Sequence, residues 1–119
     1  MKAYWHILTD NIMEQYEFTN FFHDQEYCFS LTPPEIDSLL QKENPVFVIV
    51  NMHAELFDAF SFFDNIRDVK EAQAINIIAY TDIKHDHEGI HKAKTHGVKY
   101  VCTKEQVKEL LRHIQEVLD

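Results

Sequence analysis

The sequence predicts an α/β fold in which a parallel sheet carries helices on both faces. Strand-like and helix-like periodicities alternate five times along the 119 residues, as in chains that build parallel sheets from β–α units. Residues 46–50 form an unbroken apolar run, which is typical of a strand buried on both faces. The length suits one domain spanning residues 1–119 and leaves no room for a second.

Composition excludes several classes of function. The chain carries 20 acidic residues against 11 Lys and Arg, a formal charge of -9, whereas a nucleic-acid binder needs a basic surface. No apolar run approaches the roughly 18 residues that span a membrane, and the N-terminus lacks a signal-peptide pattern. Two glycines are too few for a glycine-rich phosphate loop. We therefore expect an acidic cytoplasmic domain that binds neither nucleic acid nor membrane.

Five strands and five helices are expected in alternation. The expected strands are residues 3–8, 26–31, 46–50, 75–80 and 99–102. The expected helices are residues 11–23, a segment that begins at Thr32, residues 55–72, residues 85–95 and a last segment that begins at Thr103. Right-handed crossovers and this length favour a flavodoxin-like, doubly wound five-stranded parallel sheet of order 2-1-3-4-5. That order places Cys28 and Cys102 on opposite edges, too far apart for a disulfide.

Local signals mark the ends of several helices. Thr32 with Glu35, and Thr103 with Gln106, have the spacing of capping boxes. Gly97 stands where a glycine commonly ends a helix.

The first helix is expected to be amphipathic. Ile12, Tyr16 and Phe22 lie near one face of residues 11–23, and this face is expected to enter the core.

Polar residues gather where the predicted strands end. In an open parallel sheet, ligands bind at the carboxyl ends of the strands beside the point where the strand order reverses. The candidate site residues at this edge are Thr9, Asp10, Asn51, Thr81 and Lys104, with His53 and Asp82 as neighbours.

These segments resemble the receiver domain of two-component response regulators, the CheY-like family, over nearly the whole chain. The segments that carry the resemblance are residues 7–11, 45–51, 58–67, 77–81 and 93–98. Lys104, seven residues after Gly97, stands where the family has its lysine. In the family, three acids hold Mg²⁺ and one of them accepts the phosphoryl group.

The chain departs from this pattern at the residues that carry the chemistry. Thr9 replaces one family acid and Asn51 replaces the phosphoacceptor aspartate, which leaves Asp10. Mg²⁺ prefers carboxylate oxygens, and Lys104 offsets the single remaining charge. An amide is also a poor nucleophile compared with a carboxylate. Glu105 replaces the family's proline, so we expect a trans Lys104–Glu105 bond.

The resemblance and these departures together predict a pseudo-receiver, a phosphorylation-independent signalling module rather than an enzyme. We expect it to need no cofactor or metal and to contact protein partners through the fourth helix, fifth strand and fifth helix. A homodimer could use the same surface. One alternative is an active phosphoacceptor response regulator of a phosphorelay, using an unaligned acid such as Asp82. Another is a flavodoxin-like module that binds a small ligand.

Several site residues also have structural explanations. Asp10 could cap the first helix. Asn51 could hydrogen-bond loop amides at the strand end or imitate one fixed signalling state. Lys104 could pair with Asp10 or extend into solvent.

Histidines are frequent, eight in the chain. His85, Asp86, His87 and His91 could hold a metal or form a pH-responsive surface, although a helix and its preceding loop are usually just solvated, and this is the explanation that we favour. His6 lies within the first strand, where a hydrogen-bonded core histidine is expected.

Overall fold

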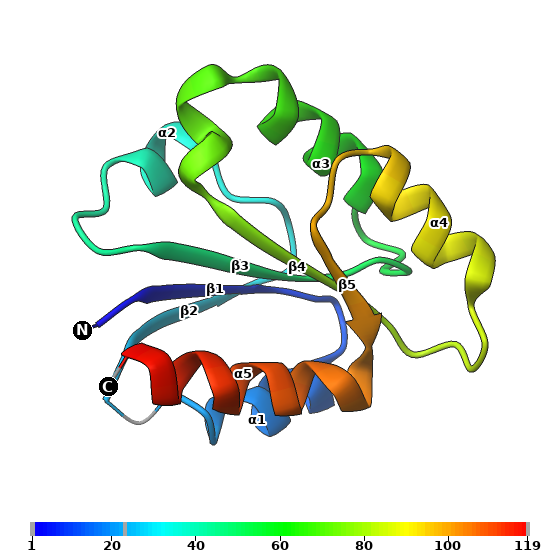
Figure 1. The fold of residues 1–119 in the computed structure, drawn as a ribbon, viewed down its shortest axis with the longest axis horizontal. Helices are drawn as coiled ribbons and strands as arrows, with labels where there is room; N and C mark the ends of the chain where they lie inside the picture. Colours follow the sequence, from blue (N-terminus) through cyan, green and yellow to red (C-terminus); the bar gives the residue numbers. More distant parts are fainter. Residues whose placement is uncertain (1, 23, 119) are drawn as a thin grey trace.

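The computed structural model describes residues 2–22 and 24–118. It contains one parallel sheet of order β2-β1-β3-β4-β5, which confirms the predicted topology (Figure 1). The strands are β1 Tyr4–Leu8, β2 Glu26–Ser30, β3 Val46–Asn51, β4 Asn76–Thr81 and β5 Tyr100–Thr103. The helices are α1 Ile12–Thr19, α2 Ile36–Leu40, α3 Ala59–Asp68, the 3₁₀ helix η1 Lys70–Ala74, α4 His87–Thr95 and α5 Lys104–Leu118.

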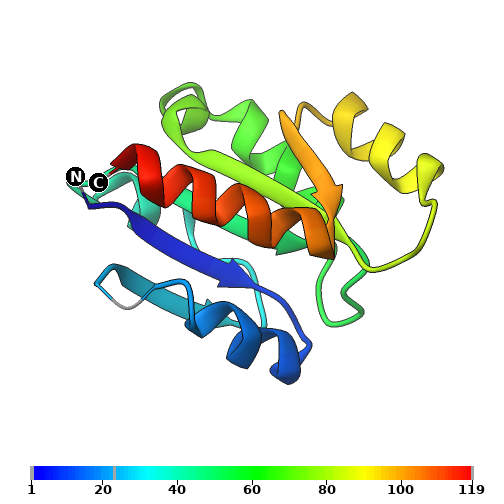
Figure 2. The ribbon, with the colours of Figure 1, turned by 60° about the horizontal axis from the view of Figure 1, so that its bottom comes forward.

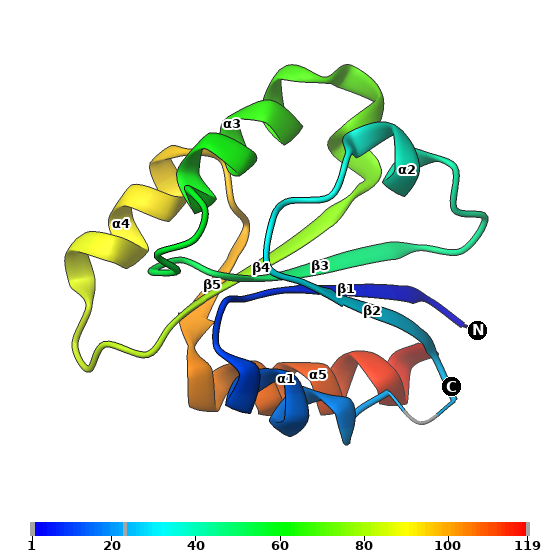
Figure 3. The ribbon, with the colours of Figure 1, turned by 180° about the vertical axis from the view of Figure 1, so that it is seen from behind.

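The helices form a layer on each face of the sheet. Helices α1 and α5 cover one face, and α2, α3 and α4 cover the other (Figures 1 and 3). Successive residues of β1 therefore enter different cores. Trp5 packs in a cluster with Phe18 of α1 and Leu111 of α5, whereas Leu8 belongs to a cluster that includes Phe62 of α3. Figure 2 shows α5 running along the sheet with β1 and α1 beside it.

The predicted buried face of α1 is wrong. Ile12 and Tyr16 are exposed, while Glu14 and Phe18 are the buried residues of the helix. Phe22 is buried as predicted, but it lies beyond the end of the helix. Glu14 and Phe18 are four residues apart and so share a face. This face docks because polar groups of the sheet edge satisfy the carboxylate of Glu14, as described below.

Two predicted helix starts are also wrong. Helix α2 begins at Ile36, and Glu35 is its N-cap residue, without a side-chain cap. Thr32 does not cap the helix, because Pro34 disfavours the helical conformation at the residue before it and the helix begins later. The predicted helix 55–72 is instead α3, capped by Asp58, followed by η1.

Other local predictions are confirmed. The backbone amide of Thr103 donates to Gln106 Oε1 at 3.0 Å, and the amide of Gln106 donates to Thr103 Oγ1 at 3.2 Å, a reciprocal capping box. Gly97 has a φ of 90° just after α4. The Lys104–Glu105 bond is trans. Cys28 and Cys102 are free thiols on the two edge strands.

Candidate functional site

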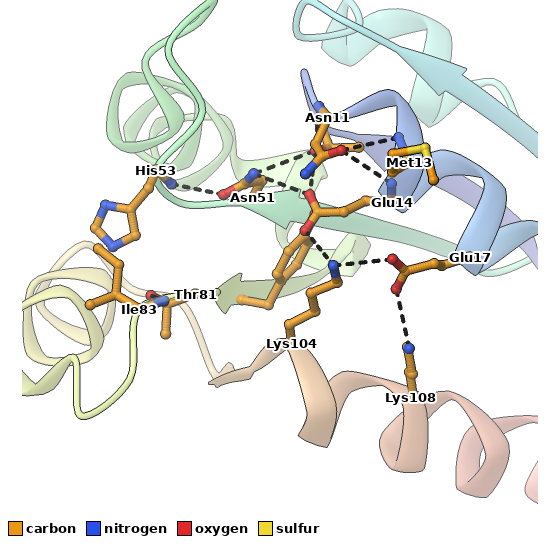
Figure 4. Close-up of polar contacts among 12 residues, drawn as sticks. Asn11, Met13, Glu14, Glu17, Asn51, His53, Thr81, Ile83, Lys104 and Lys108 are labelled. Carbon is orange, nitrogen blue, oxygen red and sulfur yellow. Dashed lines mark hydrogen bonds and ion pairs between the residues drawn. The ribbon is translucent and has the colours of Figure 1, made fainter.

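The carboxyl ends of the central strands carry a buried polar cluster. Thr9 follows β1, Asn51 ends β3, and both side chains are buried. Lys104 begins α5 at the same edge. The structure brings these three predicted residues together, but around a residue that the sequence patterns do not single out, Glu14 of α1 (Figure 4).

Glu14 is fully buried in the first turn of α1. Its Oε1 accepts hydrogen bonds from Thr9 Oγ1 at 2.9 Å and from the Tyr80 hydroxyl at 2.8 Å. Asn51 Nδ2 is a third donor to the same oxygen, at 3.3 Å. The other oxygen, Oε2, lies 3.4 Å from Lys104 Nζ. Every predicted group that converges here is therefore engaged with this one carboxylate.

Lys104 is held by two acids of α1. Its Nζ lies 3.4 Å from Glu14 Oε2 and 3.3 Å from Glu17 Oε1, and Lys108 contacts the other oxygen of Glu17 at 3.2 Å. Burial alone would lower the pKa of Lys104, but the charges and hydrogen bonds of Glu14 and Glu17 outweigh it and raise the pKa. Both earlier interpretations of Lys104, pairing with Asp10 and extension into solvent, are wrong.

Tyr80 supplies a neutral donor to the cluster. Burial raises the pKa of its hydroxyl far above the usual value, and the nearby charge of Glu14 adds to this although a hydrogen bond with Thr9 opposes it. The phenol therefore stays protonated and donates to Glu14. Its position in β4, next to Asn51 in β3, places it at the centre of the sheet edge.

Asp10 holds a loop instead of capping a helix. Its Oδ2 accepts hydrogen bonds from the backbone amides of Glu55 and Leu56 at 2.6 and 3.2 Å. Helix α1 is capped by the neighbouring Asn11, so the interpretation of Asp10 as its cap is wrong. Asp10 thus joins the end of β1 to the segment between β3 and α3.

Asn51 hydrogen-bonds a loop amide, as one of its two interpretations predicts. Its Oδ1 accepts from the amide of His53 at 3.0 Å. Its Nδ2 donates to Glu14 and lies 3.4 Å from Thr9 Oγ1. The side chain has both ends engaged and is buried.

Thr81 belongs to a second cluster, at the start of α4. Its hydroxyl donates to Asp86 Oδ2 at 2.7 Å and accepts from the amide of Ile83 at 3.1 Å. His53 Nε2 contacts the same Asp86 oxygen at 2.6 Å, and Asp86 caps α4 by accepting from the amide of Gly89. Burial would raise the pKa of Asp86, but the hydrogen bonds from His53, Thr81 and Gly89 outweigh it and lower the pKa.

Asp82 takes part in neither cluster. It lines an open depression together with Asp10, Asn51, His53 and Glu55.

The histidine-rich segment forms the start of α4. Asp86 caps this helix, and the ring centroids of His85 and His87 lie 6.4 Å apart. Within residues 2–22 and 24–118, no three His, Cys, Asp or Glu side chains are grouped to hold a metal ion. His6 is a buried core histidine, as expected, between the Tyr4 hydroxyl and Ser30 Oγ.

None of the described helices is long and apolar enough to cross a membrane.

No protein-family model and no curated protein sequence matches the chain. Solved structures do resemble it. The phosphorylated cyanobacterial phytochrome response regulator RcpA superposes with a TM-score of 0.78 at 12% identity, over 98% of this chain and 93% of that chain. The chemotaxis response regulator CheY4 of Vibrio cholerae gives 0.75 at 15% identity, over 96% and 99%. A chain from the Saccharomyces cerevisiae complex of the phosphotransfer protein Ypd1 with the receiver domain of Ssk1 gives 0.67 at 15% identity, over 87% and 79%.

These similarities show the fold. The strand order and the layers of helices match those neighbours, so the chain has the CheY-like receiver fold.

Proposed function

We propose that the chain is a pseudo-receiver, a signalling module that contacts protein partners without being phosphorylated and without enzymatic activity. The observation that carries this proposal is the buried carboxylate of Glu14, bound to Thr9, Asn51, Tyr80 and Lys104 at the carboxyl edge of the sheet. It lies among the positions where the resemblance to receivers would place the phosphorylation chemistry.

The cluster offers no nucleophile at the position of the phosphoacceptor. Asn51 holds an amide whose nitrogen donates to Glu14 and whose oxygen accepts from the amide of His53. An uncharged amide oxygen that is already hydrogen-bonded cannot attack a phosphoryl donor as a carboxylate does.

The cluster is also unfavourable for Mg²⁺. Asp10 is the remaining acid of the family's set, and its Oδ2 is already engaged by two backbone amides. Lys104 brings a positive charge to within 3.4 Å of Glu14. A divalent cation gains little where the nearest buried carboxylate is already paired with an ammonium group.

An entering phosphoryl group would meet like charge. A phosphoryl group carries about −1.5 to −2 charges at neutral pH, and it would have to lie beside the buried carboxylate of Glu14. Lys104, the cation that could stabilise it, is held by Glu14 and Glu17. Phosphorylation would therefore require the first turn of α1 to release Glu14.

The partner is proposed to be a protein. One structural neighbour comes from a complex of a receiver domain with a phosphotransfer protein, which supports contact with proteins as the mode of action. The proposed output surface consists of α4, β5 and α5, where Tyr100 is exposed, and a homodimer could form there. We place the module in the cytoplasm, without nucleic-acid or membrane partners.

An amide NMR titration with Mg²⁺ and then beryllofluoride, a phosphoryl mimic, tests the proposal. We expect no saturable shifts at Asp10, Asn51, Thr81 or Lys104. A phosphorylatable receiver domain in the same solutions serves as the positive control for the mimic. Saturable shifts at these residues that spread into α4 and β5 would overturn the proposal, because they would show a pocket that still responds to phosphate.

A further inference from the structure

Strand β2 leaves one of its edges unpaired. Among the described residues it pairs with β1 alone, at one end of the sheet (Figure 3). The amide of Thr9 donates to the carbonyl of Ser30 at 3.3 Å, so the backbone groups of Ser30 face β1. The N–H and C=O groups of successive strand residues point to opposite sides. The backbone groups of Tyr27 and Phe29 therefore face outward, away from the sheet.

The free edge lacks the features that usually prevent pairing with another strand. Edge strands are commonly protected by charged side chains, by proline or by another element that covers them. Strand β2 contains no proline, and its one charged residue, Glu26, is already paired with Lys42 at 2.8 Å. Glu26, Tyr27 and Cys28 are exposed, and Phe29 is partly exposed. The edge is thus accessible to a further strand.

We propose that β2 pairs with β2 of a second copy of the chain, antiparallel and about a two-fold axis at Cys28. Cys28 is the middle residue of the strand, so this register pairs all five of its residues. Tyr27 then lies opposite Phe29 of the partner subunit, and their outward amides and carbonyls exchange hydrogen bonds. Symmetry repeats this exchange on the other side of the axis. The two sheets become one continuous sheet.

The side chains of β2 make the strand complementary to its own copy. The rings of Tyr27 and Phe29 lie 5.6 Å apart, and pairing adds an aromatic ring of the partner beside each of them. Aromatic pairs across antiparallel strands stabilise a sheet. Glu26 lies opposite Ser30 of the partner subunit, so no two like charges within β2 face each other. The acid at one end of the strand meets a neutral residue at the other.

Salt dependence separates a second copy from a basic partner strand. Each copy carries a formal charge of -9, so two copies repel one another as whole molecules. Salt screens this repulsion, and association of the chain with itself should strengthen as salt is raised. Binding of a basic strand to the same edge should weaken instead.

The inference goes beyond the proposed function and does not depend on it. Strand β5 forms the opposite edge of the sheet. The α4, β5 and α5 surface of each copy therefore remains available to a partner when two β2 strands are paired.

Sedimentation velocity of the full chain, from about 1 μM to about 1 mM, tests for association. We expect the mass to rise from 14.1 kDa toward twice that value, and to rise at lower protein concentration when salt is raised. Hydrogen exchange locates the contact. The amides of Tyr27 and Phe29 should exchange more slowly as concentration increases, and those of Cys28 and Ser30 should change less because they already face β1.

Two variants with the same change in charge separate the β2 edge from general repulsion. Cys28→Glu places two carboxylates directly opposite each other across the two-fold axis, and like charges so placed are destabilising. We expect it to weaken association about tenfold or more. Ile83→Glu is the matched control, because Ile83 is 49% exposed in the loop after β4, and it should leave association unchanged. Both positions are exposed, so both variants should fold.

Oxidation with diamide tests the register. In the proposed pair the two Cys28 residues face each other at a position without backbone hydrogen bonds, where the Cα atoms lie about 4.5 Å apart, within the span of a disulfide. The two thiols give up two protons and two electrons to diamide, which is reduced to its hydrazine, and one S–S bond forms. We expect a covalent dimer from Cys102→Ser and none from Cys28→Ser.

A constant mass over the whole concentration range would overturn the inference. Equal weakening by the two glutamate variants, or slowed exchange centred on β5, would also overturn it. Association without the Cys28 cross-link would overturn the register. The beryllofluoride titration tests a different statement: a response there would remove the phosphorylation-independent role and leave the β2 pair standing.

Discussion

Removal of the Glu14 carboxylate is the most direct test of the buried cluster. Glu14→Ala deletes the acceptor shared by Thr9, Asn51 and Tyr80, and it removes one of the two acids that hold Lys104. Glu14→Gln keeps an acceptor oxygen and the shape of the side chain but removes the charge. The two variants separate the loss of hydrogen bonding from the loss of charge.

The expected loss in the free energy of unfolding depends on which buried groups each variant leaves without a partner. Breaking a buried ion pair costs about 3–5 kcal/mol, because the remaining charge has no partner. Lys104 retains Glu17 at 3.3 Å and its side chain is 27% exposed, so the cost at this end is reduced. The buried donors of Thr9 and Tyr80 lose their acceptor, at about 1–3 kcal/mol for each unsatisfied group. We therefore expect Glu14→Ala to lower the free energy of unfolding by about 3 kcal/mol, and Glu14→Gln by about 1–2 kcal/mol.

Denaturant unfolding followed by tryptophan fluorescence and circular dichroism measures these values. Trp5 is the single tryptophan and is fully buried against Phe22 and Phe47, so its emission should report global unfolding. Glu17→Ala is the matched control, since Glu17 also contacts Lys104 but is substantially exposed. An exposed ion pair contributes about 0–1 kcal/mol, and we expect the control to lose no more than that.

A loss for Glu14→Ala no larger than that for Glu17→Ala would refute the reasoning. It would mean that the carboxylate of Glu14 is not the acceptor that stabilises the sheet edge.

Three further predictions concern pH and backbone conformation. Burial, with the charge of Lys42, lowers the pKa of His6 from 6.5 to about 4. Between these two pH values the unfolded chain binds a proton at His6 and the folded chain does not, so the free energy of unfolding should fall by about 3 kcal/mol as pH falls from about 6.5 to about 4. An equally steep fall with pH in the free energy of unfolding of His6→Gln would contradict this. The pKa of Asp86 is lowered in the folded state. The stability that ionised Asp86 contributes is therefore present above the pKa of the unfolded state and is lost as pH falls through the pKa of the folded state. In denaturant titrations, Asp86→Asn should lower the free energy of unfolding clearly at pH 7 and should make no difference in acid. The Cβ added by Gly97→Ala would meet no heavy atom beyond the adjacent residues closer than Arg67 Cδ at 3.6 Å, but the alanine must adopt a φ of 90°. Calorimetry should therefore show a loss of about 1 kcal/mol in stability from backbone strain.

The fold could be predicted because its determinants are local. The apolar run of β3 marks a strand buried on both faces, and the capping box of Thr103 and Gln106 fixes the start of α5 within one turn. Gly97 ends α4 through a conformation that glycine adopts readily. Such signals depend on neighbouring residues, and their order along the chain then restricts the topology to few choices.

The site could be predicted only in part because its central residue depends on distant partners. Thr9, Asn51 and Lys104 follow from the strand ends, where the topology must bring them together. Glu14 does not, since a glutamate in a short helix is ordinarily assigned to the solvent face. The donors that make its burial tolerable come from β3, β4 and α5, up to 90 residues away. Assigning Glu14 to the solvent face turns Ile12 and Tyr16 toward the core, which explains why the sequence predicts these two residues to be buried.

The neutral residues at positions 9 and 51 and the acid at position 14 make sense as a set. Asn51 and Thr9 are donors to Glu14 at 3.3 and 2.9 Å, so a carboxylate at either position would lie against a buried carboxylate at hydrogen-bond distance. Two acids so close cannot both stay ionised, and one pKa would rise strongly. Neutral side chains at positions 9 and 51 and a buried acid at position 14 are therefore physically coupled. Glu14 would therefore oppose the ionised form of an aspartate introduced by Asn51→Asp alone, and a phosphoacceptor at this position would require changes on both β3 and α1.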